Sequence, residues 1–547
     1  MILQDIIRKR PGKQVLFFIF LSLGLFLLSN LPMAINVKKT PPDRIFPYYH
    51  GGAPYDYNVY LSVITLGKNG YWLNRDAFTS EKTKPGIFYF YYILVGKMAK
   101  LASLWQPAAY HLARILAVGL FLTAVFLVCR EIGGRHLGFW SSILALTATI
   151  SPPAFFGEKG AYVSYTPWWN QLEALRRLDG LPHHLFGQAM FLFSMFCIFK
   201  FIKNNNFRLV VIGSILIVIT GFFYPPAMLP ITFMLPAAVL ISIILDIIRK
   251  KKFDLNQIFT DRENLGSGIF TFSSLIPLLI SYLQTKQGHP WTVWIAWEIN
   301  KWNLLEPNFN RALLFSFGIL LLISVPAVVE TVKKNNRHWI FISLWAYMPF
   351  ILLPFVNFLR IGKLRLIGSV PFLPLSLLSI YSLNLILKSK SSSVRNTVLA
   401  LFIILTSLPV GMPSFFREIT SSRNIPFYSN IYIFNYIWQT IDYIQKNIPR
   451  NSIILSNDST GNILAAYAPV KVYFGHINQT MNFEEKQTNV RSFYSKRFSD
   501  REALAFLKKN NIRYVFSGPD EYFEAKVDYP FLKTIFQEGP AVLYQVD

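Results

Sequence analysis

The chain has 547 residues, of which 52% are hydrophobic and 15% are charged. Average soluble domains carry about 25% charged residues, so this composition, with a mean hydropathy of +0.35, excludes an ordinary soluble protein and predicts a polytopic membrane protein. A formal net charge of +25 is expected from basic cytoplasmic loops, and it gives no reason to expect a nucleic-acid partner. Both cysteines, Cys129 and Cys197, lie in apolar segments, which argues against a disulfide framework.

Apolar segments long enough to cross a bilayer follow one another through the first 412 residues. A helical span needs roughly 20 mostly apolar residues. The first candidate follows Arg8, Lys9 and Arg10 and is long enough to span, so we expect a retained first helix rather than a cleaved signal peptide. The candidate spans are 14–36, 107–129, 137–157, 184–203, 208–224, 227–248, 268–283, 311–332, 338–357, 366–387 and 396–412.

The segment 85–104 decides the orientation of the other spans. If it does not cross, the basic clusters beside the spans, from Arg8–Lys13 to Lys388–Arg395, all lie on one side of the membrane, as the positive-inside rule requires. Its aromatic run Phe88–Tyr92, followed by Lys97 and Lys100, is typical of a helix that lies in the interface. We therefore expect about eleven crossings and a cytoplasmic N-terminus. Residues 37–106, 158–183, 225–226, 284–310 and 358–365 are then expected on the outer face.

The region from about residue 413 onward changes character, because its apolar runs shorten to strand length. Strands are predicted at 452–455, 471–474, 513–516 and 541–546, with helices at 432–447 and 500–510 between them. This alternation predicts a small extracytoplasmic α/β domain at 413–547, after a transmembrane domain at 1–412.

The first outer loop carries a carboxylate beside the membrane. Asp56 lies among Tyr55, Tyr57 and Tyr60. A carboxylate at a water–membrane boundary can have its pKa raised by desolvation, which suits a general base. Asp56 also precedes an apolar run, 59–66, and is equally suited to cap a short helix. The two interpretations do not exclude each other.

The same loop ends in Glu81, Lys84 and Pro85. Pro85 is suited to begin the interfacial helix, which would place Glu81 and Lys84 at the level of the lipid headgroups. A lysine there can neutralise a lipid phosphate. Ordinary snorkelling to the interface explains the same residues.

The second outer loop ends in Asp179, His183 and His184, just ahead of a span. Histidines bind metals or hydrogen-bond phosphate, but adjacent residues project about 100° apart on a helix. The pair His183-His184 is therefore not expected to supply two ligands to one ion. Asp179-Gly-Leu-Pro is also typical of a turn before a helix.

A third group of charged residues lies in the short outer connection 358–365. Arg360, Lys363 and Arg365 occupy the face on which basic residues are scarce. A phosphate or pyrophosphate on a lipid carrier would account for this exception, and snorkelling at helix ends is the alternative.

These features, in this order, resemble the multi-spanning GT-C glycosyltransferases. That pattern has an acidic residue in the first outer loop, a Glu-Lys-Pro element, an arginine early in the next span, a basic inner turn and an acidic residue before the fourth span. The matching positions are Asp56, Glu81 with Lys84-Pro85, Arg114, Arg130 with Arg135, and Asp179. Tyr57 after Asp56 and the stretched Glu-Lys-Thr-Lys-Pro depart from it.

The resemblance implies a membrane enzyme of the bacterial plasma (inner) membrane, with a GT-C-like fold. Such an enzyme moves a sugar from a polyprenyl-phosphate donor to a glycan, lipid or protein acceptor at the outer face. Asp56 would be the general base. Asp179 and His183 would position a substrate or hold a divalent metal if one is used, although the sequence requires no cofactor. Donor and lipid phosphate would contact Glu81, Lys84, Arg114, His183, His184, Arg360, Lys363 and Arg365.

Two other classes of protein fit the same composition. One is a non-catalytic membrane protein of surface-polysaccharide assembly. The other is a transporter of lipid or sugar, for which charged or broken helices near the bilayer midplane and repeat symmetry are expected. The predicted spans are strongly apolar apart from Arg114 near an outer end, which favours the transferase over the transporter.

Overall fold

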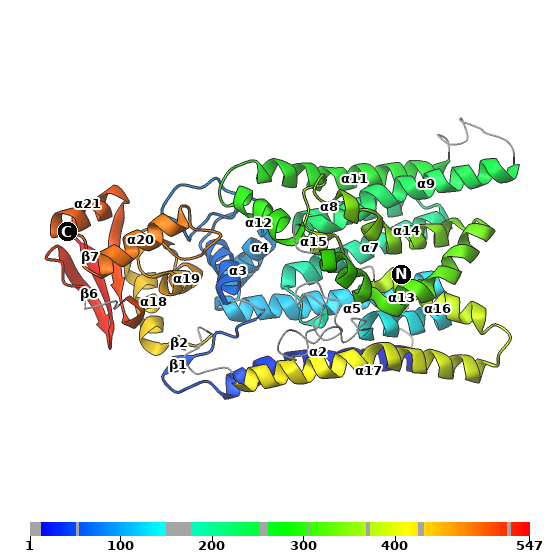
Figure 1. Ribbon diagram of the computed structural model, residues 1–547, viewed down its shortest axis with the longest axis horizontal. Coiled ribbons are helices and arrows are strands. Elements are labelled where there is room, and N and C mark those ends of the chain that lie inside the picture. Colours follow the sequence, from blue (N-terminus) through cyan, green and yellow to red (C-terminus); the bar gives the residue numbers. More distant parts are fainter. Residues whose placement is uncertain are drawn as a thin grey trace. The chain divides into compact units, whose positions relative to one another are not determined.

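A computed structural model describes residues 12–50, 54–148, 177–250, 261–303, 307–367, 372–424, 431–521 and 527–547 (Figure 1). Two compact units divide the chain. Met1–Pro32, Arg114–Ser281 and Glu298–Ser421 form the first, which we call the helical unit. Met33–Ala113, Tyr282–Trp297 and Ser422–Asp547 form the second, which we call the α/β unit. The latter combines the C-terminal region with the first predicted outer loop, and the domain boundary expected after residue 412 stays a prediction.

Long apolar helices build the helical unit, and several of them extend beyond its limits. Among the described residues, six helices are long and apolar enough to cross a membrane, and the shorter α8 and α16 are also apolar. The helices are α2 (Lys13–Lys38), α5 (Gln106–Thr147), α7 (Pro182–Asn204), α8 (Arg208–Phe223), α9 (Met228–Lys250), α11 (Arg262–Thr285), α13 (Pro307–Lys334), α14 (Arg337–Ile351), α16 (Phe372–Ile386) and α17 (Ser392–Asn424). Short helical turns connect some of them: η1 (Pro225–Ala227), η2 (Leu353–Phe355) and α15 (Lys363–Ile367).

The outer surfaces of these helices are apolar. Phe20, Leu322 and Leu405 are 70%, 73% and 69% exposed, although each is a large hydrophobic residue. Water would oppose such exposure by about 25 cal/mol per Å² of apolar surface, whereas lipid tails accept it. The chain is therefore an integral membrane protein. The buried side of the same helices forms one core, in which Phe191 packs against Trp345.

Most predicted spans coincide with these helices. The spans 107–129 and 137–157 belong to one element, α5, which is interrupted where Gly134 takes φ = 67°. Residues 149–176 lie outside the described part, as do 368–371 within the predicted span 366–387. The number of crossings stays a prediction.

The segment 85–104 forms only a short helix. Helix α4 (Phe90–Leu101) has 12 residues, which gives a length of about 18 Å at 1.5 Å per residue. A hydrocarbon core of about 30 Å is too thick for such a helix to cross, in agreement with the predicted absence of a crossing here.

The C-terminal part of the α/β unit contains a five-stranded sheet of order β4-β3-β5-β7-β6. The strands β4 (Lys471–Val472), β3 (Ile453–Leu455) and β5 (Ile512–Ser517) run parallel, and β7 (Ala541–Val546) and β6 (Leu532–Glu538) continue the sheet antiparallel. In the register, Ile454 faces Val472 and Val515 faces Tyr544. The helices of this region are α18 (Asn435–Asn447), α19 (Asp458–Tyr467), α20 (Phe483–Tyr494) and α21 (Asp500–Lys509), with the turn η3 (Pro519–Glu521).

The predicted strands and helices of this region are present. Strand β6 was not predicted, because its pattern of half-buried and exposed residues at the sheet edge gives only a weak apolar alternation. A separate two-stranded ladder pairs β1 (Arg44–Ile45) with β2 (Ile433–Phe434) and joins the start of the α/β unit to its C-terminal part.

Helix α3 (Pro54–Lys68) is held between α4 and α19. The backbones of α3 and α4 touch at two glycines: a Cβ on Gly67 would lie 2.3 Å from the Ile93 carbonyl oxygen, and one on Gly96 2.2 Å from that of Ile64. On α19, the Ala466 carbonyl accepts a hydrogen bond of 2.6 Å from Thr65 Oγ1. These contacts hold the C-terminal half of α3. The start of the helix, where Asp56 lies, is held by a hydrogen bond of 2.7 Å that Asn58 Nδ2 donates to Asn462 Oδ1 on α19.

Substitution of Gly96 by Leu should separate α3 from α4. We expect a loss of roughly 1 to 3 kcal/mol, the usual cost of overpacking a tight contact, measured by thermal unfolding of the purified protein in detergent. Gly119→Leu is the matched control, since a Cβ at Gly119 meets no atom within 4 Å. Equal melting temperatures for the two variants would contradict the close approach.

Candidate functional site

Asp56 lies in the first turn of α3, and its side chain is 52% exposed. Because α3 begins at Pro54, Asp56 is inside the helix rather than at its cap, where a carboxylate is favoured by the helix dipole. The Nε2 atom of His476 lies 3.3 Å from Asp56 Oδ1. His476 follows strand β4, and its side chain is 4% exposed. The structure thus joins the predicted base to a histidine of the C-terminal region.

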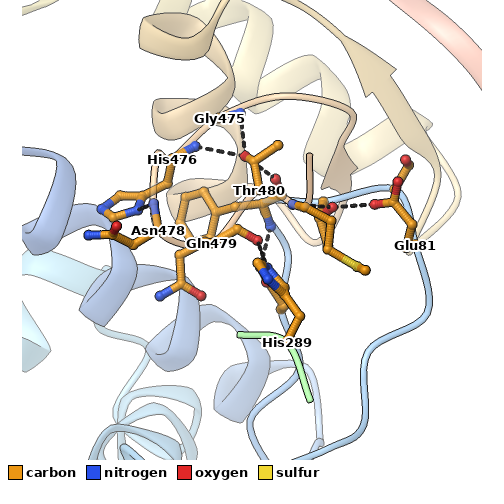
Figure 2. A network of polar contacts seen from close by, with 12 residues as sticks. Glu81, His289, Gly475, His476, Asn478, Gln479 and Thr480 are labelled. Atoms are coloured by element: carbon orange, nitrogen blue, oxygen red, sulfur yellow. Dashed lines mark hydrogen bonds and ion pairs between the residues drawn. The ribbon is translucent and has the colours of Figure 1, made fainter. Parts of the chain in front are cut away.

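A polar network continues from His476 into the first loop (Figure 2). Thr480 Oγ1 accepts hydrogen bonds from the backbone N–H groups of Gly475 and His476, at 3.2 and 3.1 Å, and donates to the Phe78 carbonyl at 2.8 Å. The loop 475–480 is therefore fastened to residue 78 by one hydroxyl group.

Asp76 is a buried carboxylate that the sequence motifs did not single out. It is 6% exposed, and its Oδ1 accepts a hydrogen bond of 2.8 Å from the Phe78 N–H. Its Oδ2 has no hydrogen bond within the described residues and faces His289 Nε2 at 3.6 Å. The same nitrogen lies 2.5 Å from the Gln479 carbonyl oxygen, so His289 bridges the first loop and the loop 475–480.

The environment of His289 favours its protonated form. Burial lowers the pKa of His289, but the carboxylate of Asp76 and the carbonyl of Gln479 outweigh it, so the pKa lies above the ordinary 6.5. The residue lies between α11 and α12 (Trp291–Asn303), in the outer connection predicted at 284–310.

Glu81 pairs with Lys486 rather than projecting freely. Lys486 Nζ donates to Glu81 Oε2 at 2.7 Å and to the hydroxyls of Thr79 and Ser80 at 3.1 Å each. Burial raises the pKa of Glu81, but hydrogen bonds from Lys486 and Thr79 hold it below its ordinary value. Burial lowers the pKa of Lys486 despite its partner. Lys84, by contrast, is exposed. The predicted contact of Glu81 and Lys84 with a lipid phosphate stays a prediction.

In the helical unit, Arg114 and Asp179 form an ion pair. Arg114 is 1% exposed, and its Nη1 donates to Asp179 Oδ1 at 2.7 Å, while Nη2 donates to the Asn30 side chain. Asp179 keeps 32% of its side chain exposed. The structure therefore brings together two residues that the motifs had selected separately, and their roles toward a substrate stay predictions.

A neighbouring arginine, Arg177, was not selected from the sequence. It is 3% exposed and donates to the backbone carbonyls of Ala145, Leu146 and Ala148 at 2.6 to 2.8 Å. Ala145 and Leu146 lie in the last turn of α5, and Ala148 directly follows its last residue. Arg177 thus caps the end of α5.

His183 and His184 lie in the first turn of α7 and are both buried. Their ring centroids are 4.2 Å apart, and the ring of His184 lies 5.1 Å from that of Tyr224. Two ligands for one ion were not expected from this pair. A group of three or more His, Cys, Asp or Glu side chains able to hold a metal is not found among the described residues.

The basic cluster of the predicted connection 358–365 is divided in the structure. Arg365 donates to Glu298 Oε1 from Nε at 3.0 Å and from Nη2 at 2.7 Å. Lys363 is half-buried, and Arg360 is exposed with a positive φ of 52°. The acidic partner Glu298, on α12, was missed because it is 67 residues away from Arg365 along the chain.

Comparison with known proteins gives no match to a family model and none to a curated protein. Solved structures do resemble the chain. The oligosaccharyltransferase of Archaeoglobus fulgidus, tethered to an acceptor peptide, is 13% identical, with a TM-score of 0.49 over 91% of this chain and 69% of its own. ArnT of Cupriavidus metallidurans, bound to undecaprenyl phosphate, is 9% identical with a TM-score of 0.49 over 97% of both chains.

A third structure, the mycobacterial arabinofuranosyltransferase AftD, is 10% identical, with a TM-score of 0.49 over 95% of this chain and 41% of its own. All three similar proteins are GT-C glycosyltransferases. The assignment of a function rests on the residues of this chain.

Replacement of His289 by Leu should destabilise the protein in a pH-dependent manner. A raised folded-state pKa contributes stability that is fully present below the unfolded value of about 6.5 and is lost as the pH rises through the folded pKa. The melting temperature should therefore fall more at pH 5.5 than at pH 8.5, as measured by thermal unfolding in detergent. The matched control is His136→Leu, outside this network, and an equal fall at both pH values for His289→Leu would refute the interaction with Asp76.

Proposed function

We propose that the protein is a membrane glycosyltransferase that moves a sugar from a polyprenyl-phosphate donor to an acceptor hydroxyl, with Asp56 as the general base. The observation that carries the proposal is the state of Asp56. Its carboxylate is half-exposed, is held at one oxygen by His476, and forms no ion pair with a lysine or arginine of the described residues. Such a carboxylate is anchored and still able to accept a proton.

The other carboxylates described above already form ion pairs or are buried. Glu81 is paired with Lys486, Asp179 with Arg114, and Asp76 is buried beside His289. A group that is paired with a cation is a poorer base, because the cation favours its ionised form. Asp56 is therefore a better base than Glu81, Asp179 or Asp76.

In the proposed reaction, the acceptor oxygen forms a bond to the anomeric carbon of the donor sugar. The bond from that carbon to the phosphate oxygen breaks, and its electron pair leaves with polyprenyl phosphate. The hydroxyl proton passes to Asp56. Cations stabilise the charge that grows on the leaving phosphate, a role that the resemblance assigns to Lys84, Arg360, Lys363 and Arg365.

The remaining residues suggested by the resemblance would position the substrates. Arg114 fixes Asp179, and His183 and His184 supply imidazole nitrogens at the start of α7. Asp179 Oδ1 already accepts a guanidinium N–H of Arg114. We therefore derive no step that uses a metal.

Asp56→Asn should abolish sugar transfer without a loss of folding. The amide is nearly isosteric with the carboxylate but cannot accept the proton, and the loss of a general base typically costs 10²- to 10⁴-fold in rate. Purified protein would be incubated with radiolabelled polyprenyl-phosphate sugars and an acceptor extract, and transfer measured by scintillation counting. Asp442→Asn, an exposed carboxylate paired with Lys446 on α18, is the matched control.

Two results would decide against this function. Near-normal turnover by Asp56→Asn would remove Asp56 from the role of base. Binding of the labelled lipid by the wild-type protein, without transfer to any acceptor, would instead favour a non-catalytic protein of surface-polysaccharide assembly.

We also propose the orientation given by the basic loops, in which the N-terminus is cytoplasmic and residues 422–547 are extracytoplasmic in a bacterial plasma membrane. A cysteine at Lys446 should react with a membrane-impermeant maleimide in intact cells, while one at Ser391 should react only after lysis. Both positions are exposed, and the native Cys129 and Cys197 are buried. The opposite labelling pattern would overturn the orientation.

A further inference from the structure

We propose that His476 is a positioning residue for Asp56, and that the C-terminal region thereby completes the site at which the acceptor hydroxyl is activated. This inference rests on the proposed function for the role of Asp56. The contact itself rests on the geometry around the imidazole, and it can be tested separately.

The hydrogen bonds of His476 determine which of its ring nitrogens carries the proton. Nδ1 accepts a hydrogen bond of 3.1 Å from the backbone N–H of Asn478. A nitrogen that faces an N–H donor must offer a lone pair, so the neutral ring carries its proton on Nε2. The Nε2–H group then donates to Asp56 Oδ1 at 3.3 Å. His476 is therefore a donor toward Asp56 and does not compete with it for the acceptor proton.

The ring cannot easily turn away from Asp56. Its side chain is 4% exposed, and it lies between the rings of Tyr55 and Phe78, with centroid distances of 6.2 and 5.9 Å. The residue before it, Gly475, packs so closely that a Cβ would meet Val472 Cγ2 at 2.9 Å. One oxygen of Asp56 is thus held in a fixed direction, and the other is left for a substrate.

The loop that carries His476 is fixed in turn to the first loop. Thr480 links the backbone of His476 to Phe78, Gln479 accepts from His289, and Lys486 pairs with Glu81 (Figure 2). All of these groups belong to the α/β unit. Thr480 and Lys486 contact residues 78 and 81 directly, and Gln479 reaches Asp76 through His289. The loop that carries His476 is therefore held in place independently of its contact with Asp56.

Two substitutions of His476 distinguish the effect of the hydrogen bond on the rate from the effect of the ring's volume. In His476→Leu the donor is lost, whereas in His476→Gln the side-chain amide N–H replaces Nε2–H at a similar reach. A misplacement of a catalytic group by about 1 Å costs on the order of 10²-fold in rate. We expect His476→Leu to lower kcat by 10- to 100-fold with KM for the donor changed by less than about twofold, and His476→Gln to recover most of kcat.

In the wild type, the His136 ring contacts Asn396 and not Asp56. The control variant His136→Leu should therefore leave kcat unchanged. Melting temperatures identify variants that fail to fold. An unchanged kcat for folded His476→Leu, or a folded His476→Gln as slow as His476→Leu, would overturn the positioning role.

A measurement without turnover distinguishes failure of this inference from failure of the proposed function. In protein labelled with ¹⁵N-histidine, the His476 signals, assigned with His476→Gln, should report a neutral ring protonated at Nε2, and they should shift in Asp56→Asn. If the wild type transfers no sugar but this signature is present, the proposed function fails and the contact stands. If the ring is protonated at Nδ1 alone, or its signals ignore Asp56→Asn, the inference fails whatever the activity.

Discussion

The partly buried ion pair between Glu81 and Lys486 is the interaction on which the α/β unit most depends. The side chain of Lys486 is 4% exposed, and its Nζ donates hydrogen bonds to one carboxylate and two hydroxyl groups. A charge removed from water costs several kcal/mol unless it is paired and hydrogen-bonded. Loss of Glu81 would therefore leave the charge of Lys486 buried and uncompensated, whereas Glu81 itself keeps 36% of its side chain exposed. Through this constraint, the first loop and the segment after β4 keep a fixed geometry.

The same principle organises the helical unit. Arg114 is almost completely buried, and Asp179 and Asn30 are the groups that it contacts. Arg177 satisfies backbone carbonyls instead of a carboxylate. These charged residues beside the membrane thus form contacts between segments of the chain. A smaller number, with Asp56 and Arg360 among them, keep exposed polar atoms that a substrate can reach.

The sequence was sufficient to locate the helices and strands, but it did not indicate which distant residues contact one another. Apolar runs and basic loops located the helices, and the alternation after residue 413 located four of the five sheet strands, because these signals are local. Asp56 could be selected for the same reason. Its partner His476 lies 420 residues further on, in a turn marked only by Gly475. Asp76 and His289 were likewise indistinguishable from solvated loop residues until the fold buried them.

The separation between the two halves of the ion pair has a consequence for biosynthesis. Glu81 and Lys486 are 405 residues apart, and translation proceeds at roughly 5 to 20 residues per second. The first loop must therefore wait about 20 to 80 s for its partner to emerge from the ribosome. During that interval Glu81 lacks Lys486 and Asp56 lacks His476. The contact between His476 and Asp56 can therefore form only when the last quarter of the chain has been made.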